Sequence, residues 1–222
     1  MENIQVQKSI QNTYYFNAKD MARLNEVLNL MPNYATRNIK KYTIVDYFYE
    51  TPEKLLEQLN ASIRIRVVDE TQTLSIVCYN DGIRREFETE MHYGDKIQDK
   101  NEYILFLEDK LEDIYTHRIG IDIARILKNL KVFLYITTER KQLEIINNSG
   151  FCCLTNIDTV MFSTKRHNIV DYVLEVKMNC LNDVANKTAY DRFVYALEQK
   201  VLLTPMDETK FDAGKRIFRS EY

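Results

Sequence analysis

The stretch Ser62-Ile63-Arg64-Ile65-Arg66-Val67 alternates between polar and aliphatic residues. Successive side chains of a β-strand point to opposite faces of its sheet. Arg64 and Arg66 are therefore expected on one face, and the aliphatic residues on the other. Charged side chains need solvent, a counter-charge or a ligand, so this strand raises the question of what its charged face contacts.

Two further stretches repeat the pattern with other charges. Glu86 and Glu88 share one face of the stretch 84–90, and Glu175 and Lys177 share one face of the stretch 172–178. One interpretation is a sheet with one face on helices and the other in water, which is common for antiparallel sheets. The other is a barrel whose lumen holds all three charged faces. Internal salt bridges between these carboxylates and the arginines are a third way to satisfy the charges.

The rest of the chain predicts an α+β fold with many strands. Strands are predicted at 41–50, 62–68, 73–79, 83–91, 131–138, 142–146, 150–162 and 171–178. Helices are predicted at about 20–31, 52–59 and 183–200, and two more in a helical insert at about 101–130 that Gly120 interrupts. Strand blocks of similar size flank the insert, which fits a two-halved single barrel. No linker or repeat interrupts residues 1–222, so we expect a single domain.

Composition excludes several classes of protein. The chain has 222 residues, a net charge of −3 and 45% hydrophobic residues, with only 5 Gly and 3 Pro, so it is neither disordered nor of low complexity. Its longest apolar runs are much shorter than a membrane span, and no signal peptide begins it, so we expect a cytoplasmic protein. The 4 cysteines and 3 histidines show no metal-site spacing, and no glycine-rich phosphate loop occurs.

The charged strands suit a particular ligand chemistry. Arginine binds phosphate oxygens with a fork of donors, and lysine neutralises them as a point charge. Clustered carboxylates become tolerable when a divalent ion such as Mg²⁺ or Mn²⁺ lies among them. Basic and acidic walls together fit a metal-bound polyanion.

Two stretches resemble a known family. Tyr47-Phe48-Tyr49-Glu50-Thr51-Pro52, followed by Leu55 and by Ala61-Ser62-Ile63-Arg64-Ile65-Arg66, is similar to the "YFDTP…L…ALRIR" signature of the CYTH, or triphosphate tunnel metalloenzyme, superfamily. The stretch 85–88 resembles its R-E-x-E strand, and 156–159 resembles its Asp-Thr strand. Tyr172-Val173-Leu174-Glu175-Val176-Lys177 looks most like the VTC-type polyphosphate polymerases, and 209–211 resembles a late S-K-[YF] element.

The resemblance implies a fold and a site. The fold would be an antiparallel eight-stranded tunnel-like β-barrel with helices packed outside. The residues implied to hold phosphate oxygens are Arg64, Arg66, Arg140, Lys177 and Lys210. The residues implied to hold Mg²⁺ or Mn²⁺ are Glu86, Glu88, Asp158 and Glu175. The chemistry would be phosphoryl transfer from tripolyphosphate or polyphosphate, by positioning and charge neutralisation.

The sequence also departs from the family pattern. The N-terminal E-x-E-x-K element is degenerate: its positions would be Ile10, Asn12 and Tyr14, or lie near Gln5 and Gln7. The stretch 74–78 lacks the usual lysine, and 151–154 lacks the arginine of the VTC type. Losing metal ligands is expected to impair a metal-dependent mechanism.

Several functions therefore stay open at this stage. The first is a metal-dependent triphosphatase or polyphosphate phosphotransferase, with an RNA 5′-triphosphatase of the capping type as a variant that would take an RNA 5′ end. The second is a catalytically inactive binding or assembly subunit, with a protein partner bound through the helices. The third is an unrelated barrel whose charged strands face water.

Overall fold

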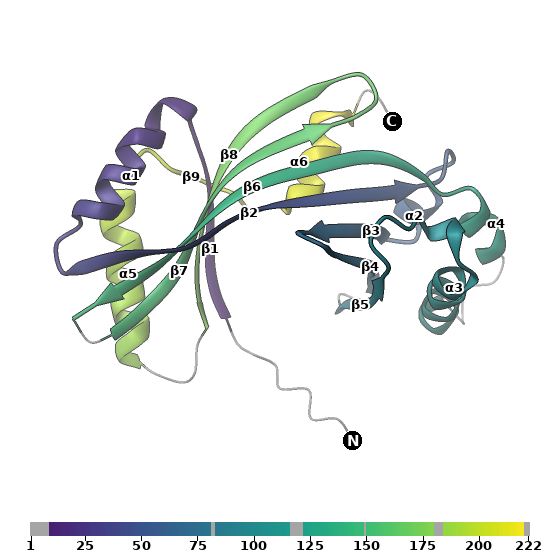
Figure 1. Cartoon of the computed structure of the whole chain (residues 1–222), viewed down its shortest axis with the longest axis horizontal. Coiled ribbons are helices and arrows are strands. Elements are labelled where there is room, and N and C mark those ends of the chain that lie inside the picture. Colours follow the sequence, from purple (N-terminus) through teal and green to yellow (C-terminus); the bar gives the residue numbers. More distant parts are fainter. Residues whose placement is uncertain (1–8, 81–82, 116–121, 149, 180–183, 220–222) are drawn as a thin grey trace. The chain divides into compact units, whose positions relative to one another are not determined.

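The computed structural model describes residues 9–80, 83–115, 122–148, 150–179 and 184–219 (Figure 1). Its strands are β1 (Ser9–Phe16), β2 (Tyr34–Glu50), β3 (Ala61–Val68), β4 (Thr71–Asn80), β5 (Ile83–Met91), β6 (Lys131–Asn147), β7 (Gly150–Ser163), β8 (Asn168–Asn179) and β9 (Thr204–Pro205). Its helices are α1 (Met21–Leu30), α2 (Leu55–Gln58), α3 (Asn101–Tyr115), α4 (Ile123–Lys128), α5 (Val184–Glu198) and α6 (Lys210–Ile217), with 3₁₀ turns η1 (Ala18–Asp20) and η2 (Ile97–Asp99).

The predicted α+β class is confirmed, but the predicted closed eight-stranded barrel is wrong for the described residues. Nine strands pair in the order β5-β4-β3-β2-β6-β7-β8-β1-β9, so the sheet begins at β5 and ends at β9 without closing. The sequence patterns missed β1 and the two-residue β9, which pairs with Tyr14 and Tyr15 of β1.

Strand β6 also differs from the prediction of two strands at 131–138 and 142–146. It runs without a break over 17 residues. The polar run Glu139-Arg140-Lys141 interrupts the apolar pattern and resembles a loop in the sequence. In the structure it remains extended, because Arg140 finds a counter-charge on the neighbouring strand β7.

The chain divides into two compact units, which we describe separately. Unit 1 consists of Met1–Tyr42, Thr138–Met161 and Ile169–Ala213. In it, β1 and β8 form an antiparallel pair, and α1 and α5 cover the apolar face of the sheet. Leu24 and Leu28 lie one turn apart on α1 and are buried with Leu174 of β8 and Phe193 of α5.

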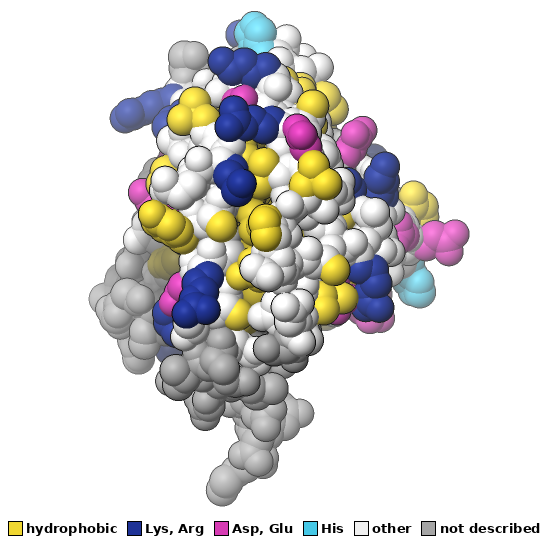
Figure 2. Space-filling view, turned by 90° about the vertical axis from the view of Figure 1, so that its left-hand side faces the viewer, with side chains coloured by type: hydrophobic (Ala, Val, Ile, Leu, Met, Phe, Trp, Pro, Cys, Tyr) yellow, Lys and Arg dark blue, Asp and Glu magenta, His cyan; other side chains and the backbone are white. Residues whose placement is uncertain are grey.

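The surface of unit 1 on the α1 and α5 side carries both charged and hydrophobic side chains. Figure 2 shows lysines and arginines interspersed with hydrophobic side chains on this face. Leu30 of α1 and Tyr195 of α5 are 70% and 64% exposed. Single exposed hydrophobic residues are normal on a protein surface, so this face alone does not identify a partner.

Unit 2 consists of Thr43–Thr137, Phe162–Asn168 and Gly214–Tyr222. It contains the meander β3-β4-β5, which confirms the predicted order of three antiparallel strands. The predicted hairpin turn at 80–82 lies partly outside the described residues. The core of unit 2 buries Ile63 and Ile65 of β3 with Leu107 and Leu111 of α3.

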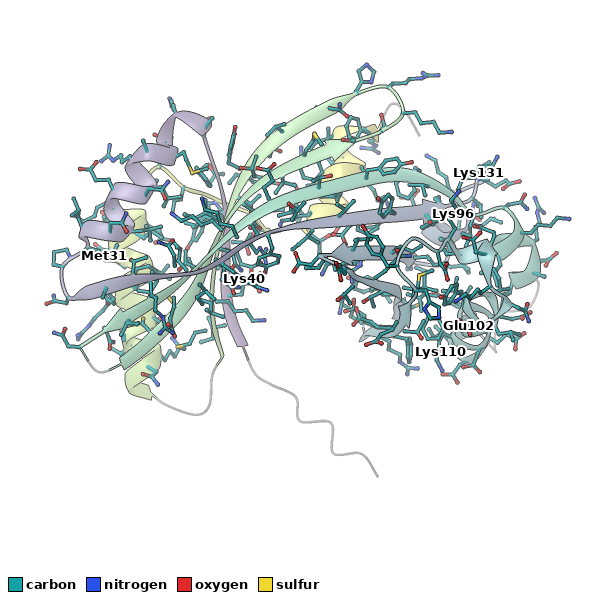
Figure 3. All side chains as sticks on the ribbon, in the orientation of Figure 1. Met31, Lys40, Lys96, Glu102, Lys110 and Lys131 are labelled. Carbon is teal, nitrogen blue, oxygen red and sulfur yellow. The ribbon has the colours of Figure 1, made fainter. Side chains whose placement is uncertain are left out.

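The helical insert is confirmed as α3 and α4, while the predicted interruption at Gly120 lies outside the described residues. Tyr103, Leu107, Leu111 and Ile114 of α3 are buried, as their helical spacing predicts. Lys110, labelled in Figure 3, belongs to the same helix. Its ammonium lies 5.6 Å from the centre of the Phe87 ring of β5.

The short helix after β2 begins later than predicted. Residues 51–54 form a turn in which the Lys54 amide donates to the Thr51 carbonyl at 2.9 Å, and Lys54 has a positive φ of 58°. The helix α2 therefore covers only Leu55–Gln58. The Glu50 carboxylate accepts from the amides of Leu56 and Glu57, which satisfies donors of the first turn.

Candidate functional site

Two cations of unit 1 converge on one buried carboxylate. The Arg140 Nε and Nη2 atoms donate to the two oxygens of Asp158 at 2.8 and 2.7 Å. The Lys210 Nζ atom donates to Asp158 Oδ2 at 2.7 Å. The Asp158 side chain is 0% exposed, and those of Arg140 and Lys210 are 15% and 23% exposed. One negative charge thus faces two positive charges in a largely dry environment.

A second carboxylate, Glu175 on β8, is held by amides. Asn156 Nδ2 donates to Glu175 Oε1 at 2.7 Å, and Gln11 Nε2 donates to Glu175 Oε2 at 3.2 Å. Gln142 Nε2 donates in turn to Asn156 Oδ1 at 3.1 Å. Arg140 Nη2 lies 3.8 Å from Glu175 Oε2. The side chains of β6, β7, β8 and β1 therefore form one continuous polar layer.

Lys177 lies two residues beyond Glu175 on β8 and so shares its face. In the antiparallel register of β1 and β8, Gln11 lies opposite Lys177, and Thr13 lies opposite Glu175. Among the described residues, no hydrogen bond or ion pair involves the Lys177 ammonium. We name the set Arg140, Asp158, Glu175, Lys177 and Lys210, with Gln11, Gln142 and Asn156, the Asp158 cluster.

Burial and the nearby carboxylates shift the pKa values of Arg140 and Lys210 in opposite directions. Burial alone would lower the pKa of the Arg140 guanidinium, but the hydrogen bonds and charge of Asp158, with the charge of Glu175, raise that pKa above its ordinary value. For Lys210 burial is the larger effect, and it lowers the pKa of the ammonium despite the attraction of Asp158. Lys210 is thus the less strongly held of the two charges.

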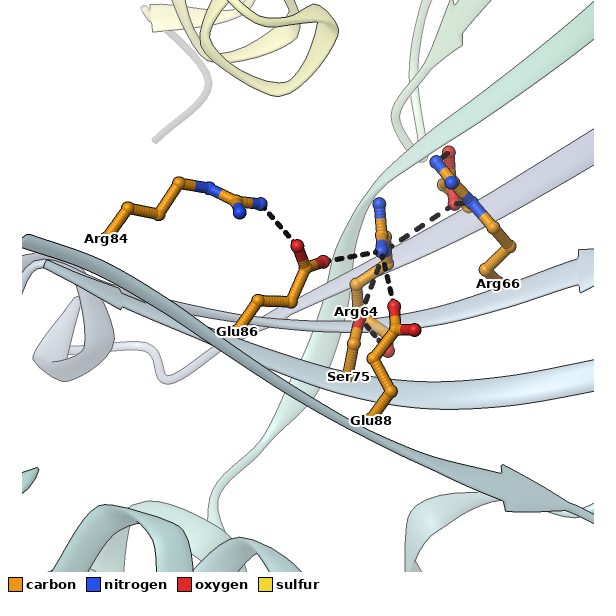
Figure 4. A network of polar contacts seen from close by, with 7 residues as sticks. Arg64, Arg66, Ser75, Arg84, Glu86 and Glu88 are labelled. Carbon is orange, nitrogen blue, oxygen red and sulfur yellow. Dashed lines mark hydrogen bonds and ion pairs between the residues drawn. The ribbon is translucent and has the colours of Figure 1, made fainter. Parts of the chain in front are cut away.

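Unit 2 contains a separate network around Arg64 (Figure 4). Arg66 Nε and Nη2 donate to the two oxygens of Asp46 at 2.7 and 2.9 Å. Arg64 Nε donates to Ser75 Oγ at 3.1 Å and lies 3.8 Å from Asp46 Oδ1. Arg66 is 39% exposed and Arg64 is 16% exposed.

Strand β5 supplies the remaining partners of this network. Arg64 Nη2 lies 3.2 Å from Glu86 Oε1 and 3.5 Å from Glu88 Oε1. Arg84 Nη2 donates to Glu86 Oε2 at 2.7 Å. Burial, followed by the positive charge of Arg66, lowers the pKa of Arg64, and the three nearby carboxylates oppose this shift. We name the set Asp46, Arg64, Arg66, Ser75, Arg84, Glu86 and Glu88 the Arg64 cluster.

The residues predicted from the sequence fall into these two clusters. Arg140, Asp158, Glu175, Lys177 and Lys210 belong to unit 1. Arg64, Arg66, Glu86 and Glu88 belong to unit 2. Their roles toward phosphate or metal stay predictions.

Sequence reasoning missed several members of the clusters. Asp46 is the main counter-charge of Arg66, and an aspartate inside an aromatic and β-branched strand was a signal that could have identified it. Asn156 lies two residues before Asp158, so the same alternation places it on the same face. Gln11 and Gln142 carry no charge and gave no comparable signal.

The arrangement of the carboxylates bears on whether they could hold a metal ion. Both oxygens of Asp158 and both oxygens of Glu175 accept from nitrogen donors, and both oxygens of Glu86 contact arginines. The described residues contain no group of three His, Cys, Asp or Glu side chains placed to hold a metal. A divalent ion such as Mg²⁺ takes several oxygen ligands. As placed here, these carboxylates act as counter-charges and do not fit a resident metal ion.

Comparisons with known proteins agree with the fold. A protein from Bacillus halodurans, provisionally assigned as an adenylate cyclase, has 13% identity and a TM-score of 0.51, with 93% of this chain and 97% of that chain covered. An adenylyl cyclase candidate from Hippeastrum, described as having a dominant triphosphatase activity, has 14% identity and a TM-score of 0.52, with 96% and 95% covered. A Pyrococcus horikoshii protein has 12% identity and a TM-score of 0.50, with 97% and 100% covered.

The sequence itself gives the family. No curated protein matches the chain significantly. Among the described residues, no helix is both long and apolar enough to cross a membrane. The model of the CYTH domain matches residues 11–184, which is most of the chain and includes all the strands from β2 to β8. The chain therefore belongs to the CYTH domain family.

Proposed function

We propose that this chain binds the triphosphate group of its ligand through the Asp158 cluster. The observation that carries the proposal is the convergence of Arg140 and Lys210 on Asp158, beside Lys177. Arg140 and Lys210 contact the two carboxylates, and Lys177 on the same face of β8 contacts neither, so the cluster holds one positive charge in excess. A polyanion would supply the missing negative charge.

The donors of the cluster have capacity left for such a ligand. Arg140 uses only part of its fork of N–H groups on Asp158, and a lysine ammonium has three donors, of which Lys210 spends one there. Lys177 has no partner among the described residues. Hydrogen bonds between these cations and phosphate oxygens are the strong, charge-assisted kind.

The Arg64 cluster is proposed as a separate, weaker phosphate site within unit 2. Arg64 and Arg66 have the donor geometry for it, but Asp46, Glu86 and Glu88 already balance the arginines of this cluster. Phosphate binding there would exchange one set of counter-charges for another. The proposal therefore assigns the main contribution to the Asp158 cluster.

The ligand class follows from the family and from the strand β8. The Tyr-x-Leu-Glu-x-Lys pattern of Tyr172–Lys177 resembles VTC-type proteins, which favours inorganic tripolyphosphate or polyphosphate over an RNA 5′ end. The residues of β1 beside Glu175 support binding rather than catalysis, because Gln11 and Thr13 are not carboxylates. The positions Ile10, Asn12 and Tyr14 alternate with them and so lie on the other face of β1, where Ile10 and Tyr14 pack in the core. A protein partner at the helical insert stays a prediction.

Thermal unfolding tests the proposal without assuming turnover. We expect tripolyphosphate at about 100 times its dissociation constant to stabilise the chain by roughly 2.7 kcal/mol, which is roughly 5–10 °C in Tm for a chain of this size. Long-chain polyphosphate, a nucleoside triphosphate and a 5′-triphosphorylated RNA serve as alternative ligands. Sulfate at equal ionic strength is the control. An unchanged Tm with every triphosphate would refute the proposal.

A second candidate function is metal-dependent hydrolysis of the same ligand. The dominant triphosphatase activity of the Hippeastrum protein favours it. In that case Mg²⁺ or Mn²⁺ would have to displace nitrogen donors from Asp158 and Glu175 in unit 1, or bind to Glu86 and Glu88 in unit 2. Phosphate release that requires Mg²⁺ or Mn²⁺ and disappears in a Glu175→Gln variant would establish hydrolysis. If the ligand binds but no phosphate is released, the result would favour a catalytically inactive binding subunit.

A further inference from the structure

The carboxylates of the Asp158 cluster are arranged as acceptors for nitrogen donors. Asp158 accepts from Arg140 through both oxygens and from Lys210 through Oδ2, at distances of 2.7 to 2.8 Å. Its side chain is 0% exposed. A divalent ion that took the place of the guanidinium or the ammonium at these oxygens would leave a largely buried cation without its counter-charge.

The direction of the amide chain leads to the same conclusion for Glu175. An ionised carboxylate can only accept, so Asn156 must present its NH₂ group to Glu175. Its carbonyl oxygen is then free to accept from Gln142, as observed at 3.1 Å. Gln11 presents its own NH₂ group to the other oxygen of Glu175. Each oxygen of Glu175 therefore already accepts a hydrogen bond from an amide N–H group.

Strand β1 adds no acidic ligand on this face. Its side chains opposite Lys177 and Glu175 are Gln11 and Thr13. A Mg²⁺ or Mn²⁺ ion takes carboxylate and other oxygen ligands, and the oxygens of both carboxylates in the cluster already accept from nitrogen donors. Cations, not a metal, are thus available to neutralise an anion here.

We propose that the Asp158 cluster binds its triphosphate ligand as the metal-free anion, with Arg140, Lys177 and Lys210 in the charge-neutralising role of a divalent ion. This inference rests on the proposed function, since it specifies the ionic form of the same ligand. It goes beyond that proposal by predicting that binding needs no divalent cation.

Calorimetric titration with tripolyphosphate separates the two proposals. Metal-stripped protein is titrated in EDTA, in Mg²⁺ and in Mn²⁺ at matched ionic strength. We expect tripolyphosphate to bind in EDTA at least as tightly as in Mg²⁺ or Mn²⁺. The reason is that complexation by the metal lowers the concentration of the free tripolyphosphate anion. Binding that appears only with a metal would overturn this inference and leave the proposed function standing. Absence of binding under all three conditions would refute the proposed function and the inference that rests on it.

A gain of metal binding provides a second test that needs no ligand and no turnover. The variant Gln11→Glu/Thr13→Glu places two further carboxylates beside Glu175, because these positions face β8 in register. The variant Asn17→Glu/Ala18→Glu adds the same charge at two exposed positions just after β1 and is the matched control. Circular dichroism checks that both variants fold.

Electron paramagnetic resonance of Mn²⁺ alone gives the readout. We expect the Gln11→Glu/Thr13→Glu variant to bind close to one Mn²⁺ per chain at least tenfold more tightly than the wild type or the control. Stoichiometric Mn²⁺ binding by the wild type would overturn the inference. A folded variant that gains no affinity would overturn the claim that the uncharged face of β1 keeps a metal out.

Discussion

The Asp158 cluster and the Arg64 cluster use the same residue types with different balances. Both contain an arginine bound through two hydrogen bonds to a buried aspartate, Arg140 on Asp158 and Arg66 on Asp46. In the Asp158 cluster a second cation, Lys210, also donates to the shared carboxylate at 2.7 Å, whereas the second cation near Asp46, Arg64, lies 3.8 Å away. The Arg64 cluster also has as many carboxylates as arginines. If the Asp158 cluster binds triphosphate as proposed, an excess of positive charge, and not the presence of arginine, distinguishes it from the balanced Arg64 cluster.

Removing the shared carboxylate of unit 1 should have the largest effect on stability. Asp158→Asn leaves Arg140 and Lys210 largely buried and without their main counter-charge, so we expect a loss of about 3–5 kcal/mol in the free energy of unfolding. Urea denaturation measures it. The control is Asp191→Asn on α5, whose exposed pair with Lys187 should be worth less than about 1 kcal/mol. Equal effects of both substitutions would contradict the description of the cluster.

The matching substitution in unit 2 should cost less. In Asp46→Asn, Arg66 is 39% exposed and can be solvated, and Arg64 keeps Ser75, Glu86 and Glu88 as partners. We expect a loss of about 1–3 kcal/mol by the same denaturation assay. A loss as large as that of Asp158→Asn would show that the two clusters are equally dependent on one carboxylate.

Removing the uncharged partner of Arg64 should reduce the stability by a smaller amount. Ser75→Ala removes the hydroxyl that accepts from Arg64 Nε at 3.1 Å, while the two glutamates remain. Because the other partners of Arg64 stay in place, we expect a loss of about 1 kcal/mol. Ser75→Thr keeps a hydroxyl and is the matched control. If Ser75→Ala lowered the free energy of unfolding as much as Asp46→Asn, the hydroxyl and not the charge balance would hold Arg64 in place.

The smallest expected effect is the pH dependence of the stability that Lys210 contributes. Burial lowers the pKa of Lys210 below its ordinary value of 10.5. Between the two pKa values the unfolded chain binds more protons than the folded chain, so the contribution of Lys210 to stability rises with pH in that window. The free energy of unfolding of the wild type, minus that of Lys210→Met, should therefore increase from neutral pH toward pH 10.5. A constant or falling difference would show that Lys210 is not desolvated.

The sequence predicted the elements that depend on local pattern. The meander β3-β4-β5 and the helices α3 and α4 follow from alternation and helical spacing over short stretches. The unbroken strand β6 could not be predicted in the same way, because Arg140 stays in the strand through a contact with Asp158, 18 residues away. Closure of the sheet is likewise a non-local property, and the resemblance to a closed barrel was the wrong guide to it.

The candidate sites show the same division. Alternation found the charged residues of β3, β5 and β8, because a charge on an otherwise apolar strand is easy to recognise. It did not find Gln11, Gln142 or Asn156, whose amides matter only through the neighbours that they contact. Nor could it tell that Asp158 would face two cations, since Lys210 comes from a helix 52 residues further along the chain.

The most direct test of the central claim, that the Asp158 cluster binds triphosphate, is the affinity of a Lys177→Gln variant for tripolyphosphate. Lys177 has no partner among the described residues, so its removal should leave the fold intact. Isothermal titration calorimetry should show binding weakened at least about tenfold, the equivalent of about 1.4 kcal/mol and the scale of one charge-assisted contact. Lys19→Gln, at an exposed position of the same unit, should change the dissociation constant less than about twofold. Equal affinity of Lys177→Gln and the wild type would contradict the account.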